Sequence, residues 1–127
     1  MHMLGYVTIG TTDMAKATAF YDALLAEIGA KQLFGQDRIK FYGSAPNAPM
    51  LAVCLPYDQE AQAPGNGVMI ALPAPGPEAI QKLYDKAISL GATDEGAPGE
   101  RIPGMFYGAY VRDLDGNKLC FYEMKLG

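Results

Sequence analysis

The run Asp113-Leu114-Asp115-Gly116-Asn117 has the residue types and spacing of a calcium ligand set, because an Asp-x-Asp-Gly-Asn run opens the helix-flanked calcium loop. The glutamate that closes such a loop would fall at Met124, however, and the flanking residues alternate as strands do. We therefore predict a hairpin turn here. In this turn Gly116 supplies a positive φ and the aspartates bond the turn backbone.

Sulfur atoms are a second group of possible donors. Cys54, Met69 and Cys120 are soft ligands that suit copper(I) or zinc, and the two cysteines alone could form a redox pair. Neither cysteine lies in a Cys-x-x-Cys arrangement, and free cysteine usually packs as a small buried hydrophobe. We favour packing for both cysteines, and binding of a soft metal remains the alternative.

Aromatic residues and one arginine are a third group. The possible stacking residues for a planar or apolar ligand are Tyr42, Phe106, Tyr107, Tyr110 and Tyr122. Arg101 would bind a carboxylate or phosphate, and Tyr6 and Tyr122 are the tyrosines most favoured to contact a ligand. Plain packing is the alternative for all of them. The Gly- and Pro-rich segment 95–104 is interpreted as either a flap over the site or an exposed connection.

Length and composition limit what these residues can belong to. The 127 residues, half of them hydrophobic, predict a single domain covering 1–127. A net charge of −4 without a basic stripe argues against nucleic acid, and no apolar run approaches the length of about 20 residues that a membrane span needs. With no secretory signal and only two cysteines, we expect a cytoplasmic protein with reduced thiols. The single histidine, His2, receives no functional role.

The first half predicts one strand, one helix and three further strands. Residues 6–10 alternate as a half-buried strand. Asp13 can cap a helix that runs to about Ile28 and stops at Gly29. Extended stretches follow around 30–34, 38–42 and 50–55, with turns between them at 35–37 and 43–49. This order is β-α-β-β-β, and the module covers about residues 4–57.

The second half repeats this order over about residues 67–125. A strand at 69–72 precedes a helix that starts near Pro77 and ends at Gly91. Phe20-Tyr21-Asp22 is echoed by Leu83-Tyr84-Asp85, and Val53-Cys54-Leu55 by Leu119-Cys120-Phe121. Internal duplication explains these parallels and places Tyr6 opposite Met69 and Cys54 opposite Cys120. Chance similarity of two amphipathic helices is the alternative.

Strand alternation also separates two faces of the predicted sheet. The larger apolar side chains must face the helices, because water is excluded there. The opposite face then carries small, soft and aromatic groups instead of charges, as a pocket lining would. Its residues are Tyr6, Thr8, Ala52, Cys54, Met69, Ala71, Cys120 and Tyr122.

Several motifs together resemble the vicinal-oxygen-chelate superfamily, which includes glyoxalase I, the bleomycin resistance proteins and the extradiol dioxygenases. Gly65-Asn66-Gly67 is similar to the family's Gly-Asn-Gly-x-His strand entry. The run from Asp113 to Leu119 resembles its Asp-Pro-Asp-Gly-Asn-x-apolar-Glu hairpin, and Ala19-Phe20-Tyr21 resembles a helix with a Phe-Tyr pair. The resemblance covers nearly the whole chain. It implies an α+β fold of two tandem βαβββ modules that form a curved mixed sheet with the helices on its outer face.

The resemblance also implies where a divalent metal would be held, since enzymes of the superfamily bind one through His and Glu side chains on the concave face. The matching histidine positions are Tyr6 and Met69, and the glutamate positions are Cys54 and Cys120. None of these is a hard imidazole or carboxylate ligand. We therefore predict no metal and no other cofactor, and these residues argue against glyoxalase-type chemistry.

The favoured function is binding of a small amphipathic molecule, of the kind the bleomycin resistance relatives represent. A divergent lyase, isomerase or dioxygenase-like enzyme is the alternative, and no catalytic residue is predicted for it. Relatives commonly dimerise, so a homodimer is expected, and self-association is a third possible role. The predicted pocket residues are Tyr6, Thr8, Tyr42, Cys54, Met69, Ala71, Arg101, Tyr107, Cys120 and Tyr122.

Overall fold

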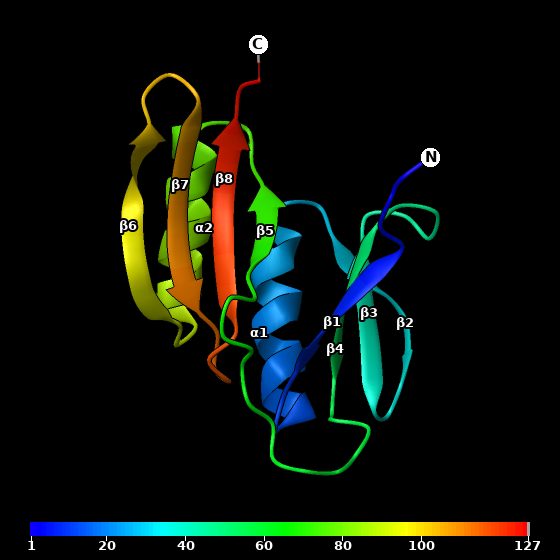
Figure 1. Ribbon diagram of the computed structural model, residues 1–127. Coiled ribbons are helices and arrows are strands. Elements are labelled where there is room, and N and C mark those ends of the chain that lie inside the picture. Colours follow the sequence, from blue (N-terminus) through cyan, green and yellow to red (C-terminus); the bar gives the residue numbers. More distant parts are fainter. Residues whose placement is uncertain (127) are drawn as a thin grey trace. The chain divides into compact units, whose positions relative to one another are not determined.

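The computed structural model describes residues 1–126 and contains two compact units, Met1–Pro64 and Gly65–Gly127 (Figure 1). Each unit has the element order β-α-β-β-β and one four-stranded mixed sheet. The predicted α+β class and the two βαβββ modules are confirmed. The predicted modules, about 4–57 and 67–125, each fall within one unit.

The first unit consists of β1 (Tyr6–Gly10), α1 (Met14–Ala26), β2 (Lys31–Gln36), β3 (Ile39–Gly43) and β4 (Met50–Cys54). Its strand order is β1-β4-β3-β2, with β1 parallel to β4 and the other pairs antiparallel. Helix α1 starts where the side chain of Asp13 accepts a hydrogen bond of 3.1 Å from the Lys16 amide. The chain leaves the helix through Gly29 at a φ of 75°.

The second unit consists of β5 (Ile70–Pro73), α2 (Pro77–Ser89), β6 (Thr93–Ile102), β7 (Phe106–Arg112) and β8 (Lys118–Met124). Its strand order is β5-β8-β7-β6, and β5 runs parallel to β8. Pro77 occupies the first turn of α2, as predicted, and Gly91 has a φ of 105° just after its end. Within residues 1–126, neither helix is long and apolar enough to cross a membrane.

The segment 95–104 is neither a flap nor a simple connection, because most of it belongs to β6. This strand lies at the edge of its sheet and shifts register against β7 at three places, between Asp94 and Ile102. Proline has no backbone N–H to donate to a neighbouring strand, so it is tolerated at an edge or a bulge. Glycine has no side chain and is common at bulges. The Pro- and Gly-rich composition therefore reflects a bulged edge strand.

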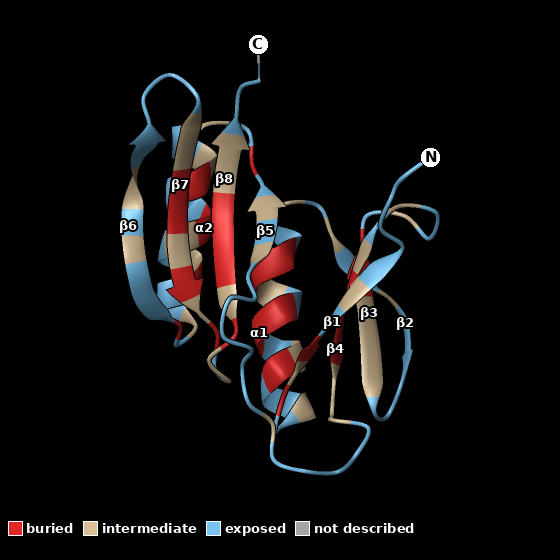
Figure 2. Ribbon diagram, in the orientation of Figure 1, coloured by how far each residue is buried: buried red, intermediate tan, exposed pale blue. Residues whose placement is uncertain are grey.

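Each helix packs on its own sheet (Figure 1), and the buried residues lie in the helices and in the strands beside them (Figure 2). The buried core residues include Phe20, Leu24, Leu51 and Val53 in the first unit and Ile80, Leu83, Val111, Leu119 and Phe121 in the second. Burying a side chain of this size stabilises a fold by about 1.5–3 kcal/mol. Successive strand residues point to opposite faces, so each sheet also has an open face turned away from its helix.

The strand register corrects the proposed equivalence of the two cysteines. Cys120 pairs with Ala71 of β5 and Tyr110 of β7. In the first unit the residue that pairs in the same way, with Thr8 of β1 and Phe41 of β3, is Ala52. Cys54 lies two residues further along β4, beside Gly10 and Ile39. When the two sheets are aligned by strand pairing, the similar Val-Cys-Leu and Leu-Cys-Phe triplets are therefore offset by two residues.

Candidate functional site

The open face of the second sheet brings several predicted site residues together. Residues 118, 120 and 122 of β8 share this face with residues 106, 108 and 110 of β7, because the register pairs Tyr110 with Cys120 and Gly108 with Tyr122. We call this surface the second open face. Its side chains are Ala71, Arg101, Phe106, Tyr110, Arg112, Lys118, Cys120, Tyr122 and Met124.

Two cations meet at the ring of Tyr110. The guanidinium carbon of Arg101 and the Nζ atom of Lys118 each lie 5.3 Å from the ring centroid, within the range of a cation–π interaction. Arg101 also donates a hydrogen bond of 2.6 Å to the carbonyl of Ala97. Burial raises the pKa of the Tyr110 hydroxyl above its ordinary value, and the thiol of Cys120 adds to this. Tyr110 therefore serves as a neutral, protonated platform.

A stacked aromatic pair lies on the same face, two residues along the strands from the Tyr110–Cys120 pair. Phe106 and Tyr122 have ring centroids 5.6 Å apart and planes only 4° from parallel. Gly108, opposite Tyr122, leaves the necessary space, since a Cβ atom there would lie 2.9 Å from Cε1 of Phe106. Arg101 and Tyr122 were predicted from the sequence as site residues, and the structure places them on the same face.

Cys120 is completely buried beneath this surface. Burial raises the pKa of its thiol, while the hydrogen bond with Tyr110 and the charges of Lys118 and Arg101 act in the opposite direction and are weaker. A protonated, inaccessible thiol is a poor nucleophile and a poor metal ligand. These observations support the packing interpretation of this cysteine.

The open face of the first sheet carries a second aromatic cluster. Tyr6 meets Phe41 edge to face, with centroids 5.0 Å apart, and Phe41 stacks on Phe34 at 4.5 Å. Tyr6 and Phe34 are about half exposed, at 54% and 52%. We call this surface the first open face. Its side chains are Tyr6, Thr8, Phe34, Phe41, Ala52 and Cys54.

Phe34 and Phe41 were missed by the sequence analysis, although a signal was present. Phe41 has the same pairing position in its sheet as Tyr110 has in the other. Aligning the two halves on strand pairing instead of on the cysteines would have identified it. The small side chain of Ala52, which pairs with Phe41, leaves room for the rings above it.

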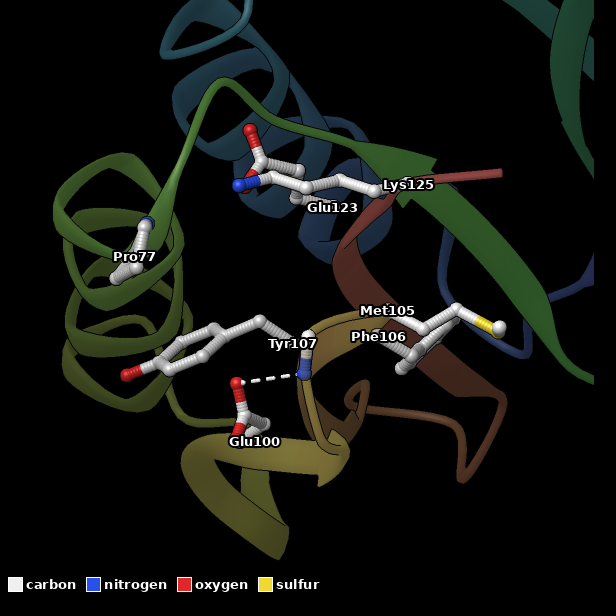
Figure 3. Close-up of a pocket in the computed structure, with 8 residues that line it drawn as sticks. Pro77, Glu100, Met105, Phe106, Tyr107, Glu123 and Lys125 are labelled. Carbon is white, nitrogen blue, oxygen red and sulfur yellow. Dashed lines mark hydrogen bonds between the residues drawn. The ribbon is translucent and has the colours of Figure 1, made fainter. Parts of the chain in front are cut away.

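Two predicted site residues lie on helix-covered faces instead. Tyr42 is 1% exposed, and its hydroxyl donates a hydrogen bond of 2.8 Å to the Asp22 carboxylate on α1. Tyr107 extends toward the start of α2, where it lines a pocket of about 130 Å³ with Pro77, Glu100 and Glu123 (Figure 3). Neither side chain shares an open face with Tyr6 or Tyr122. Met69, just before β5, is exposed and is on the same side as Ala71 by strand alternation.

The side chains at the superfamily's metal positions do not fit a hard divalent ion. Tyr6 and Met69 replace the histidines, Cys120 replaces one glutamate, and the strand register places Ala52 at the other. Methionine and alanine offer no hard donor, and Cys120 is held protonated by burial. Among residues 1–126, no three His, Cys, Asp or Glu side chains are grouped so that they could hold a metal ion.

Comparison with known proteins gives a consistent family match. The family model of the Glyoxalase/Bleomycin resistance protein/Dioxygenase superfamily matches residues 3–121. A glyoxalase/bleomycin resistance protein from Albidiferax ferrireducens T118 has a solved structure that is 30% identical, with a TM-score of 0.87 over 98% of this chain and 100% of that one.

More distant structures share the fold. A glyoxalase-related enzyme from Fulvimarina pelagi is 19% identical, with a TM-score of 0.76 over 96% of this chain and 88% of that one. A glyoxalase/bleomycin resistance protein/dioxygenase family enzyme from Burkholderia phytofirmans PsJN is 20% identical, with a TM-score of 0.74 over 95% and 98%. No curated protein sequence matches this chain significantly.

Proposed function

We propose that this chain, which belongs to the glyoxalase/bleomycin resistance protein/dioxygenase superfamily, binds a small amphipathic molecule against an open sheet face without a divalent metal. The observation that carries the proposal is the composition of the second open face. There the stacked rings of Phe106 and Tyr122 adjoin two cations at the ring of Tyr110. An apolar surface beside a charged one matches a ligand with the same two parts.

Each part of this face contributes a different interaction. The aromatic pair offers flat apolar area, and aromatic contacts of this kind contribute about 0.5–1.5 kcal/mol beyond simple burial. The charged groups fix the orientation of the ligand, because they interact with only one end of it.

The proposed independence from metal rests on chemistry at the matching positions. Lewis-acid catalysis in this superfamily needs ligands that hold a hard cation and leave positions open for substrate oxygens. A protonated, buried Cys120 and the side chain of Ala52 do not supply them. We therefore propose binding as the function, and no reaction step is assigned.

Two measurements on the full chain test the proposal. The first is elemental analysis after expression in medium containing nickel, zinc, iron and manganese, and the expected metal content is far below one ion per chain. The second is calorimetric titration with 2-naphthol, a neutral amphipathic probe. We expect saturable binding that Tyr122→Ala weakens by roughly tenfold, as loss of about 1.4 kcal/mol would do.

Tyr57→Ala is the matched control, since Tyr57 is an exposed tyrosine outside both open faces, and it should bind as tightly as the unmodified chain. A tightly held, stoichiometric metal would contradict the proposal. So would the absence of saturable binding, or an equal loss in both variants.

A further inference from the structure

We propose that the ligand of the second open face is a planar aromatic anion, whose acidic group is bound by Arg101 and Lys118 while its ring packs against Phe106 and Tyr122. This inference rests on the proposed binding function and goes beyond it by naming the charge and size of the ligand.

The charge of the ligand follows from the two cations that converge on one ring of this face. Arg112, on the same side of β7, is already paired with Glu95 at 2.8 Å. Within residues 1–126, neither Arg101 nor Lys118 has a carboxylate partner within 4 Å, and both lie near the ring of Tyr110.

The two cations are also close enough to repel one another at low ionic strength. Each lies 5.3 Å from the same centroid, so they are at most about 11 Å apart, within the screening length of dilute salt. An anion bound beside Tyr110 would offset this repulsion and satisfy the unused donors of the guanidinium group. A cationic ligand would increase the repulsion.

Two glycines of β6 hold the guanidinium group of Arg101 in place. A Cβ atom on Gly99 would lie 2.8 Å from Nη1 of Arg101, and one on Gly96 would lie 3.2 Å from Nη2. Nη2 also donates to the carbonyl of Ala97 at 2.6 Å. The planar group therefore rests on bare backbone in one orientation, which reduces the entropy lost when it binds an anion. Gly96 and Gly99 are positioning residues in this respect.

The size of the ligand follows from the strand geometry. The pair Tyr110–Cys120, where the cations lie, is two residues from the pair Gly108–Tyr122, where the aromatic stack lies. A strand rises about 3.3–3.4 Å per residue, so the two subsites are about 7 Å apart. An aromatic ring with an acidic group on a one- or two-atom arm spans this distance. The ligand class is therefore small aryl-alkyl carboxylates or aryl phosphates.

Calorimetric titration with matched naphthalene probes tests the inference. We expect 2-naphthylacetate to bind the full chain at least tenfold more tightly than its neutral amide, 2-naphthylacetamide. Added salt should reduce this preference, because Arg101 is exposed and Lys118 is only partly buried. A third probe, 2-naphthyl phosphate, distinguishes the two acids, and tighter binding of either acid than of the amide supports an anionic ligand.

Variants assign the preference to named residues. Arg101→Gln should reduce the preference for the acetate over the amide to within about twofold while leaving the affinity for the amide unchanged. Gly99→Ala should reduce this preference only partially, by displacing the guanidinium group of Arg101. Arg38→Gln is the matched control, because Arg38 lies over the ring of Tyr57 at the same 5.3 Å on another part of the chain. Thermal melts verify that each variant is folded, and Arg101→Lys replaces Arg101→Gln if the latter unfolds. The lysine should retain only part of the preference.

The possible failures are distinguishable. Equal affinity for acetate and amide overturns this inference and leaves the proposed function standing. Absence of saturable binding by any of the probes overturns both. A preference that survives in Arg101→Gln, or disappears in Arg38→Gln, refutes the assigned subsite.

Discussion

Replacing Asp113 by alanine tests whether the Asp-x-Asp-Gly-Asn run is a structural turn. Asp113 is 5% exposed, and the Oδ1 atom of its carboxylate accepts hydrogen bonds of 2.9 Å from the amides of Asp115 and Asn117. Its Oδ2 accepts a third bond, of 3.0 Å, from Nδ2 of Asn117. The amide of Gly116, at a φ of 87°, donates to the carbonyl of Asp113 and completes the turn between β7 and β8.

The magnitude follows from these bonds. A hydrogen bond to a charged group contributes about 1.5–3 kcal/mol, and a buried donor left without an acceptor costs about 1–3 kcal/mol. In Asp113→Ala the amide of Asp115 can turn to water, whereas Asn117 is buried and loses an acceptor for two donors. We expect a loss of about 3 kcal/mol in the free energy of unfolding, which lowers the melting temperature of a chain of this size by roughly 10 °C.

Urea unfolding followed by circular dichroism, together with thermal melts, measures this loss. Asp113→Asn keeps one carbonyl acceptor and should lose about half as much. Asp37→Ala is the control, since Asp37 is an exposed aspartate in the turn between β2 and β3, and its cost should stay within about 0.5 kcal/mol. If Asp113→Ala were no more destabilising than Asp37→Ala, the carboxylate would not organise the turn and the reasoning would be refuted.

Three further changes test other parts of the structure. Tyr42→Phe should lower the free energy of unfolding by about 1 kcal/mol near neutral pH. Burial and a carboxylate partner raise the pKa of Tyr42, so the stability difference from the unmodified chain should shrink as pH rises above about 10. Urea unfolding measures this difference, and a constant difference would contradict the expectation. A disulfide reagent should modify Cys54 in the native chain and Cys120 only after denaturation. The reason is that Cys120 is buried and the pKa of its thiol is raised. Labelling of both cysteines at the same rate would argue against this burial. Gly91→Ala should lower the free energy of unfolding by about 1–2 kcal/mol, because Gly91 has a φ of 105° and an added Cβ atom would lie 3.0 Å from Cδ2 of Leu114. Gly5→Ala, with open space around it, should not lower it, and equal thermal melts of the two variants would disprove the strain.

The equivalence of Cys54 and Cys120 between the two halves was the main feature that sequence reasoning assigned incorrectly. The triplets around Cys54 and Cys120 look alike, yet Ala52 is the residue that pairs as Cys120 does. A shift of two residues keeps every side chain on the same face, so the hydrophobic pattern cannot detect it. Only the hydrogen-bonded partners on the neighbouring strands distinguish the two alignments.

Local sequence signals determined both helices, most of the strands and the turn at Gly116, because capping residues, glycines at positive φ and periodic apolar side chains act within a few residues of one another. They also placed Tyr6 and Tyr122 on open faces. The tertiary structure alone decided that 95–104 is a bulged edge strand, that Tyr42 packs under α1, and that Arg101 lies over Tyr110. These outcomes depend on which strands pair and which face each helix covers, and such contacts join residues that are far apart in the chain.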